Sequence, residues 1–258
     1  MYVLLSPAKK MTEGACVSEH SSSELELADD LQQLLKITAT MRPNRLKKLM
    51  GISDALAELN AQRFGAMLWP MTPDKARQAA LLFAGDTYQG LDASTLSAED
   101  LNWAQDHLGI LSGLYGLLRP LDLIQPYRLE MGTSLKNRRG KDLYAFWGDR
   151  LAALIDQRLK GHAQPVVINC ASNEYFKAAG TKALKAKVIT PIFLEQKGDT
   201  AKTISFLAKK ARGAMARYIV VNRLTKPEQM QGFDQHGYRF DAQRSTADKP
   251  VFVAQRAA

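Results

Sequence analysis

Residues 166–175, VVINCASNEY, join a strand-sized apolar run to a cluster of polar side chains. Met1–Leu5 begins the chain in the same way, as a short apolar strand that ends in the polar loop SPAK at residues 6–9. Further strand-sized apolar runs lie at residues 81–84, 188–194 and 251–254, and helical patterns separate them. Strands that alternate with helices predict the α/β class, with a mixed sheet flanked by helices.

Three of these predicted strands, at residues 1–5, 81–84 and 166–170, are followed by polar side chains that can bind a ligand. The side chains are Ser6, Lys9, Asp86, Tyr88, Asn169, Ser172 and Glu174. In open α/β sheets, ligands bind in the crevice beyond the carboxyl ends of the strands. We therefore expect a shared pocket at this edge of the sheet, and the alternative is that these residues are polar only because they lie in loops.

The composition is that of an ordinary globular protein. Of the 258 residues, 46% are hydrophobic and 24% are charged. The apolar runs are far shorter than a membrane span, and the first residues lack the basic region of a signal peptide. No linker, repeat or low-complexity tract divides the chain. We expect one domain over residues 1–258, in the cytoplasm and without a membrane partner.

Cysteine and histidine are too few and too scattered to predict a metal site. The two cysteines, Cys16 and Cys170, exclude a disulfide framework and a cysteine-rich zinc site by number alone. The four histidines show no spacing typical of metal ligands. We expect neither a metal nor an organic cofactor.

Positive charge is concentrated in one segment. The formal net charge of +9 indicates a polyanionic partner, nucleic acid before membrane. Residues 197–223 hold seven cations and one acid. On a predicted helix over residues 200–221, five of these cations fall within an arc of about 160°. They are Lys202, Lys209, Lys210, Arg212 and Arg217. Because no acid shares their face, the pattern favours phosphate binding over a merely solvated surface.

Two residues interrupt this cationic face. Phe206 can stack on a base, or its ring can pack under the lysine stems, and we expect the second arrangement. Gly213 allows a backbone to approach closely, either that of a ligand or that of another element of the fold.

Residues 43–64 predict a helix, a tight turn and a second helix. Gly51 suits the left-handed cap that ends the first helix, and Ser53 suits the N-cap of the second. The arrangement resembles a helix-hairpin-helix, which binds a DNA phosphate through the main-chain N–H groups of its turn. Lys47 and Lys48 lie beside that turn. The alternative is an ordinary helical hairpin with no ligand.

Several longer motifs closely resemble the YaaA peroxide-stress family of bacteria, in collinear order from residue 1 to about residue 252. They are SPAK at 6–9, GDTY at 85–88, LSGLYGLLRPLD at 111–122, PYRLEMG at 126–132, GKDLYAFWG at 140–148, NCASNEYF at 169–176 and KKARG at 209–213. The chain departs from the usual family pattern at Thr87, Cys170 and Leu207. A thiol at position 170 is open to oxidation if it is exposed.

The resemblance implies a mixed α/β fold with a positively charged cleft. It also implies binding to DNA that is led by DNA structure rather than by sequence, and induction during peroxide stress. A further implication is a role in limiting the damage that iron and peroxide together do to DNA.

Two functions compete for the predicted pocket, in which Asp86, Glu130, Asn169 and Glu174 lie among Lys9, Arg128 and Lys210. The favoured one is a DNA-binding stress protein without enzymatic activity, because no catalytic motif is recognisable. The alternative is an enzyme that acts on a nucleotide or a flipped base, with Asp86 or Glu174 as general base. The same charged groups can also serve only to join loops by ion pairs. Nothing in the sequence indicates an obligate protein partner, and no Glu-x-x-His motif indicates direct iron binding.

Overall fold

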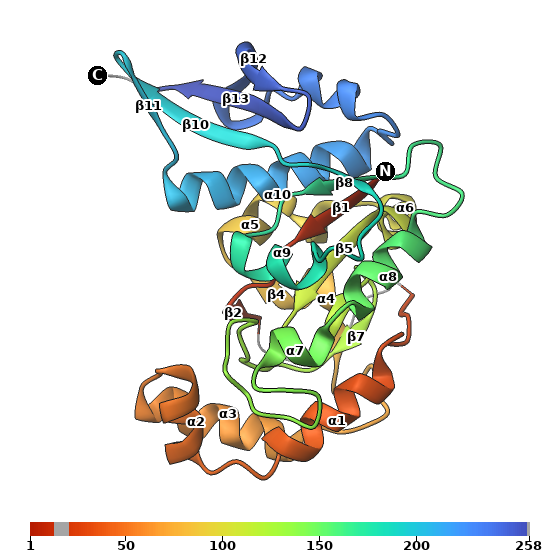
Figure 1. The fold of residues 1–258 in the computed structure, drawn as a ribbon, viewed down its shortest axis with the longest axis vertical. Helices are drawn as coiled ribbons and strands as arrows, with labels where there is room; N and C mark the ends of the chain where they lie inside the picture. The colour runs from red at the N-terminus through yellow and green to blue at the C-terminus, as the bar shows by residue number, and fades with distance from the viewer. Residues whose placement is uncertain (13–20, 257–258) are drawn as a thin grey trace.

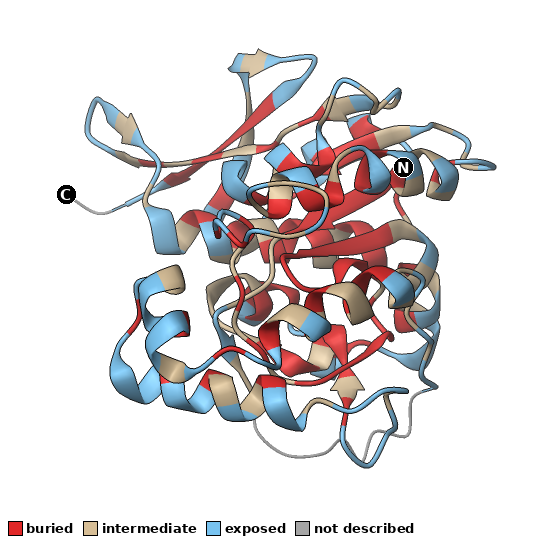
Figure 2. Ribbon diagram, turned by 60° about the horizontal axis from the view of Figure 1, so that its bottom comes forward, coloured by how far each residue is buried: buried red, intermediate tan, exposed pale blue. Residues whose placement is uncertain are grey.

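A five-stranded mixed sheet lies at the centre of the computed structural model, which describes residues 1–12 and 21–256 (Figure 1). Its strands, in spatial order, are β6 (Gly116–Leu118), β5 (Leu108–Ser112), β1 (Tyr2–Leu5), β8 (Val166–Asn169) and β9 (Lys187–Ile189). All neighbours are parallel except β5 and β6. The buried residues are concentrated in this sheet, as Figure 2 shows. The predicted strands at Met1–Leu5 and in residues 166–170 are confirmed.

A second, four-stranded sheet carries the C-terminal part of the chain. Its spatial order is β11 (Thr200–Lys202), β10 (Ile192–Lys197), β13 (Lys249–Gln255) and β12 (Tyr238–Thr246). The single strand predicted over residues 188–194 is wrong, because β9 and β10 belong to different sheets. Pro191 lies between them, and proline has no main-chain N–H to donate to a strand ladder.

Two short strand pairs join β2 (Lys10–Met11) to β4 (Phe83–Ala84), and β3 (Arg77–Gln78) to β7 (Leu123–Ile124). The strand predicted over residues 81–84 is therefore only half right, because α4 (Ala79–Leu82) takes its first two residues. A short apolar run does not distinguish a buried helical turn from a strand, and the two alanines that precede it favour the helix.

The helix α10 (Ser205–Val221) lies between the two sheets and contacts β1 on one side and β10 on the other (Figure 1). It begins later than the helix predicted from residue 200, and Lys202 lies on strand β11 instead. A helix covered on two sides needs small side chains, and α10 buries Ala208, Ala211 and Ala214. Its closest neighbour is α5 (Asp86–Leu91).

Seven more helices lie in the described residues, and the first three of them lie apart from the five-stranded sheet, at the end of the molecule opposite the four-stranded sheet (Figure 1). The seven are α1 (Ala28–Thr38), α2 (Pro43–Met50), α3 (Asp54–Ala66), α6 (Ala98–His107), α7 (Leu143–Trp147), α8 (Arg150–Arg158) and α9 (Asn173–Ala179). Short 3-10 helices lie at η1 (Ala93–Thr95), η2 (Pro227–Gly232) and η3 (Gln235–Gly237).

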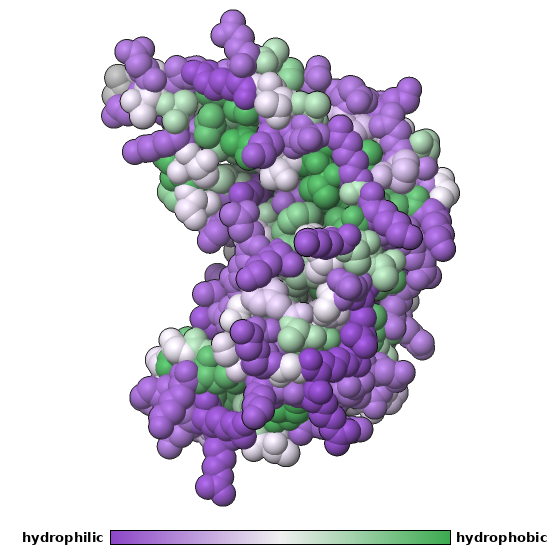
Figure 3. All heavy atoms as spheres, viewed as in Figure 1, coloured by the Kyte–Doolittle hydropathy of each residue, from purple (hydrophilic) through white to green (hydrophobic). Residues whose placement is uncertain are grey.

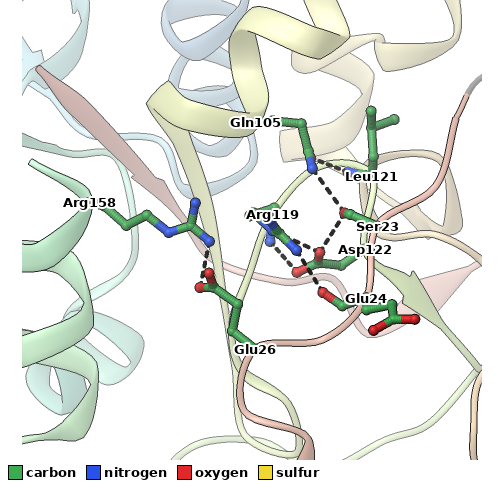
Figure 4. A network of polar contacts seen from close by, with 8 residues as sticks. All are labelled: Ser23, Glu24, Glu26, Gln105, Arg119, Leu121, Asp122 and Arg158. Carbon is green, nitrogen blue, oxygen red and sulfur yellow. Dashed lines mark hydrogen bonds and ion pairs between the residues drawn. The ribbon is translucent and has the colours of Figure 1, made fainter.

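A polar network holds residues 23–26 in an extended course before α1 (Figure 4). The carboxylate of Asp122, 1% exposed, accepts hydrogen bonds from Ser23 Oγ at 2.6 Å and from Arg119 Nε at 3.0 Å. Gln105 Nε2 donates to Ser23 Oγ at 2.9 Å, and an Arg119 amino group donates to the Glu24 carbonyl at 2.6 Å. One buried carboxylate thus joins α6, the loop before β7 and the segment that leads into α1.

Removing the Asp122 carboxylate is expected to lower the free energy of unfolding. Asp122→Ala leaves the Arg119 charge and the Ser23 hydroxyl without their acceptor, and loss of one partner of a buried ion pair costs about 3–5 kcal/mol of unfolding free energy. Urea denaturation measures the change. Asp199→Ala removes an exposed carboxylate and serves as the control, with an expected change within about 0.5 kcal/mol. Similar midpoints for the two variants would contradict a structural role for Asp122.

Candidate functional site

A pocket of about 450 Å³ lies beyond the carboxyl ends of β1 and β8. Seven of the ten predicted pocket residues line it, namely Ser6, Lys9, Asp86, Arg128, Glu130, Ser172 and Glu174. The two strands are parallel neighbours, so the loops that follow them meet. The main-chain N–H of Ser172 donates to Ser6 Oγ at 2.8 Å, and the two hydroxyl oxygens lie 3.3 Å apart. We call this cavity the strand-end pocket.

Two of the other three predicted residues, Tyr88 and Asn169, lie behind its wall, and the third, Lys210, lines a different cavity. The buried hydroxyl of Tyr88 donates to the Ser6 carbonyl at 3.1 Å. Asn169 accepts from the N–H of Ala171 at 3.1 Å and donates to Thr190 Oγ1 at 3.4 Å. Both residues position the loops that form the pocket and do not face its interior.

The three carboxylates of the pocket have different surroundings. Glu130 lies between two cations, 3.3 Å from Lys9 Nζ and 3.1 Å from Arg128 Nε. Glu174 accepts a hydrogen bond from the main-chain N–H of Gly132 at 2.9 Å. The half-buried carboxylate of Asp86 has no hydrogen-bond or ion-pair partner within residues 1–12 and 21–256. Two of the three acids therefore hold loops together, and Asp86 is left to meet a ligand.

Five cations line the same pocket against these three acids: Lys9, Lys10, Arg128, Lys209 and Arg212. Lys10 was not among the predicted site residues, although it directly follows the SPAK loop at 6–9 and lies on β2. Its position next to Lys9 at the end of a strand was the available sequence signal. The pocket thus combines cations from β2, from α10 and from the loop that holds Arg128.

The structure divides the cationic face predicted for residues 200–221. Lys209 and Arg212 line the strand-end pocket, whereas Lys210 lines a different cavity. Arg217 donates to the carbonyls of Leu91 at 3.1 Å and Asp92 at 2.7 Å, at the end of α5. A guanidinium that binds the carbonyls at the end of a helix has a structural role. Arg217 is therefore not available to bind a ligand.

The two residues that interrupt this face behave differently from each other. Phe206 is 59% exposed, so the prediction that its ring packs under the lysine stems is wrong. Gly213 is buried, and its backbone lies directly against that of α5. A side chain at this position would collide with the carbonyl oxygen of Thr87. The close approach that Gly213 allows is therefore that of another element of the fold.

Cys170 lies in the wall of the strand-end pocket but is only 2% exposed. Burial raises the pKa of its thiol to about 12. Because the thiolate is the form that reacts with oxidants, this thiol is protected at neutral pH. The other cysteine, Cys16, lies outside the described residues, as does His20.

The helical hairpin has the predicted termini. Gly51 ends α2 with φ of 61°, and its N–H donates to the Lys47 carbonyl at 2.9 Å. Ser53 caps α3 by accepting from the N–H of Leu56 at 3.3 Å. The ammonium of Lys47 forms an ion pair with Asp54 at 2.8 Å, while Lys48 is exposed.

Figure 3 shows a hollow on one side of the molecule, between the part that carries α10 with β11 and the part that carries α2 with α3. The short strands β2 and β4, which border the strand-end pocket, lie at the base of this hollow (Figure 1). The strands that border the strand-end pocket and the α2–α3 hairpin thus lie along the same hollow.

The described residues contain neither a candidate metal site nor a candidate membrane-spanning helix. No group of three or more His, Cys, Asp or Glu side chains is arranged there to hold a metal ion. None of the described helices has the length and apolar character that crossing a membrane requires.

Comparison with known proteins finds matches over almost the whole chain. The sequence profile described as peroxide stress protein YaaA matches residues 1–244. UPF0246 protein SPO0106 of Ruegeria pomeroyi is 51% identical over 253 residues, which cover 98% of each chain.

Proposed function

Because the chain belongs to the YaaA family of peroxide stress proteins, we propose that it acts in peroxide stress by binding DNA in the hollow beside the strand-end pocket. One observation carries the proposal: five cations line the strand-end pocket, and β2 and β4, which border that pocket, lie at the base of a hollow that has α10 on one side and the α2–α3 hairpin on the other. Lysine and arginine side chains that neutralise phosphates supply the affinity of sequence-independent DNA binding.

The same arrangement supports binding that does not depend on base sequence. Lysine and arginine contacts to phosphates fix the position of a protein on DNA and carry no sequence information. In this proposal Lys10, Lys209 and Arg212 contact one stretch of backbone, and the turn at Gly51 with Lys48 contacts another as a helix-hairpin-helix. We further propose that the protein, by occupying DNA in the cytoplasm, limits the damage that iron and peroxide do to it.

Charge reversal in the hairpin tests the second contact. In a Lys47→Glu, Lys48→Glu variant, like-charge repulsion is expected to weaken duplex binding by at least about tenfold at low salt. The fold should persist, because both side chains are exposed and the Lys47–Asp54 pair, as a surface ion pair, contributes about 0–1 kcal/mol. Fluorescence anisotropy with two duplexes of unrelated sequence measures the affinity, and both should lose the same factor.

The matched control is a Lys182→Glu, Lys185→Glu variant, which changes the net charge by the same amount. Both lysines are exposed, and the N–H of Lys185 bonds to Asp156 of α8, on the side of the molecule away from the hollow. Equal losses in the two variants would mean that only net charge matters, and the hairpin would then have no specific role.

A second candidate function rests on Asp86, the pocket carboxylate without a protein partner in the described residues. A cavity of about 450 Å³ has the size of small-molecule sites. With nearby cations to hold a phosphate, Asp86 could act as general base on a nucleotide or a flipped base. Chromatography of DNA and nucleotides incubated with the protein separates this candidate from binding alone, since only an enzyme forms a product.

A further inference from the structure

A second cavity, of about 260 Å³, lies between α10 and the beginning of β12. Its lining consists of Leu207, Lys210, Ala211, His236, Tyr238 and Arg256. It shares no lining residue with the strand-end pocket. Neighbouring residues of α10 therefore serve different cavities, with Lys209 in one and Lys210 in the other.

Three basic side chains from three elements meet at this second pocket: Lys210 from α10, His236 from η3, and Arg256 just after β13. The half-buried Lys210 has no ion-pair partner in the part of the chain that the structure describes. Burial lowers the pKa of His236, and the positive charges of Lys210 and Arg256 lower it further. Arg256 is paired with the buried carboxylate of Glu195, so among the described residues the unpaired positive charge of the pocket is that of Lys210.

One buried acid bonds to two residues of this pocket through its two oxygens. Glu195 is 3% exposed, and its two oxygens accept hydrogen bonds from the Tyr238 hydroxyl and from Arg256 Nε. This buried carboxylate fixes Arg256 through Nε, and the terminal amino groups of that guanidinium have no hydrogen-bond partner among the described residues. Those groups and the Lys210 ammonium are thus available as donors to a bound anion.

The backbone at His236 is also unusual. This residue has φ of 56°, in the left-handed region that histidine rarely adopts, and Gly237 follows with φ of 81°. Residues held in such conformations concentrate at ligand-binding sites, where the surrounding structure maintains them. Here the left-handed turn joins η3 to β12 at the rim of the pocket.

We propose that this second pocket binds the phosphate group of a phosphate monoester. Donors from three elements match the three free oxygens of a terminal phosphate, whereas a backbone phosphodiester presents only two and carries a nucleoside on each side. Leu207 and Ala211 provide an apolar wall for the carbon that bears the phosphate. The inference is independent of duplex binding in the hollow, because the two pockets share no residue.

Nuclear magnetic resonance of the histidine side chains of the full chain tests the proposal directly. Titration with inorganic phosphate and with a nucleoside 5′-monophosphate should shift the His236 ring signals saturably, while those of His107 and His162 stay in place. Lys210→Met should weaken this binding at least tenfold, because it removes a charged donor and keeps the stem. Lys182→Met, at an exposed lysine that lines neither pocket, is the matched control, and the affinity should stay within twofold of the unmodified protein.

Two oligonucleotide probes identify the source of the phosphate. A single strand with a 5′-phosphate should shift the His236 signals, and the same strand with a 5′-hydroxyl should not. If the phosphorylated strand binds more tightly than the mononucleotide, the natural ligand is a strand end, and the reverse order indicates a small metabolite. Equal shifts with the hydroxyl strand, no response to phosphate, or equal losses from Lys210→Met and Lys182→Met would each overturn the proposal.

Discussion

A variant with Lys10→Gln, Lys209→Gln and Arg212→Gln is expected to lose about 10²–10³-fold in duplex affinity at about 0.1 M salt. All three cations line the strand-end pocket at the base of the hollow, and the structure gives none of them an ion-pair partner among the described residues. Each phosphate neutralised by a cation contributes about 0.9 to the slope of log affinity against log salt, so the slope should fall by about 2.7. The loss should therefore shrink as salt is raised.

Lys9 is left unchanged in this variant, because it pairs with Glu130 and its removal would disturb the pocket itself. The control replaces three exposed lysines outside the hollow, in a Lys160→Gln, Lys182→Gln, Lys185→Gln variant. Anisotropy titrations at several salt concentrations should show a much smaller change for the control. If the pocket variant matches the control, the strand-end pocket is not the DNA surface. If the unmodified protein binds no duplex, the proposed function itself fails.

Gly213→Ala is expected to destabilise the fold by about 3 kcal/mol or more, because the new methyl group would meet backbone that cannot move aside. An ideal Cβ at Gly213 would lie 1.7 Å from the carbonyl oxygen of Thr87 and 2.8 Å from the nitrogen of Leu91. A Cβ at Gly90 would likewise lie 2.0 Å from the Lys210 carbonyl oxygen. The backbones of α5 and α10 therefore touch at these two glycines, and α10 lies between the two sheets.

The control is Gly65→Ala, in helix α3. No atom lies within 4 Å of the Cβ that this change adds. Alanine favours the helix over glycine, so this variant should gain roughly 0.5–1 kcal/mol. Urea denaturation followed by circular dichroism compares the two variants. A Gly213→Ala protein as stable as the unmodified chain would show that α5 and α10 do not make this contact.

Apolar runs and capping residues in the sequence correctly predicted several strands and helix ends. Met1–Leu5 and the run at 166–170 form neighbouring parallel strands, and residues 43–64 form two helices with the expected left-handed cap at Gly51. Ser53 caps α3, as predicted. These features depend on residues close together in the chain, because caps and strand patterns act over a few positions. The family motifs, likewise read from the sequence alone, identified the protein class that the comparisons confirm.

Which side chains share a surface was decided only by tertiary packing. The cations of residues 200–221 look equivalent on a helical wheel, yet Lys202 lies on a strand, Arg217 binds carbonyls of α5, and Lys210 faces a second pocket. Lys209 and Arg212 alone among these five line the strand-end pocket. A wheel describes one helix in isolation, whereas α10 is covered by β1, β10 and α5 from three directions. Contacts between residues far apart in the chain have no local sequence signal, and these contacts determine which charges remain free for a ligand.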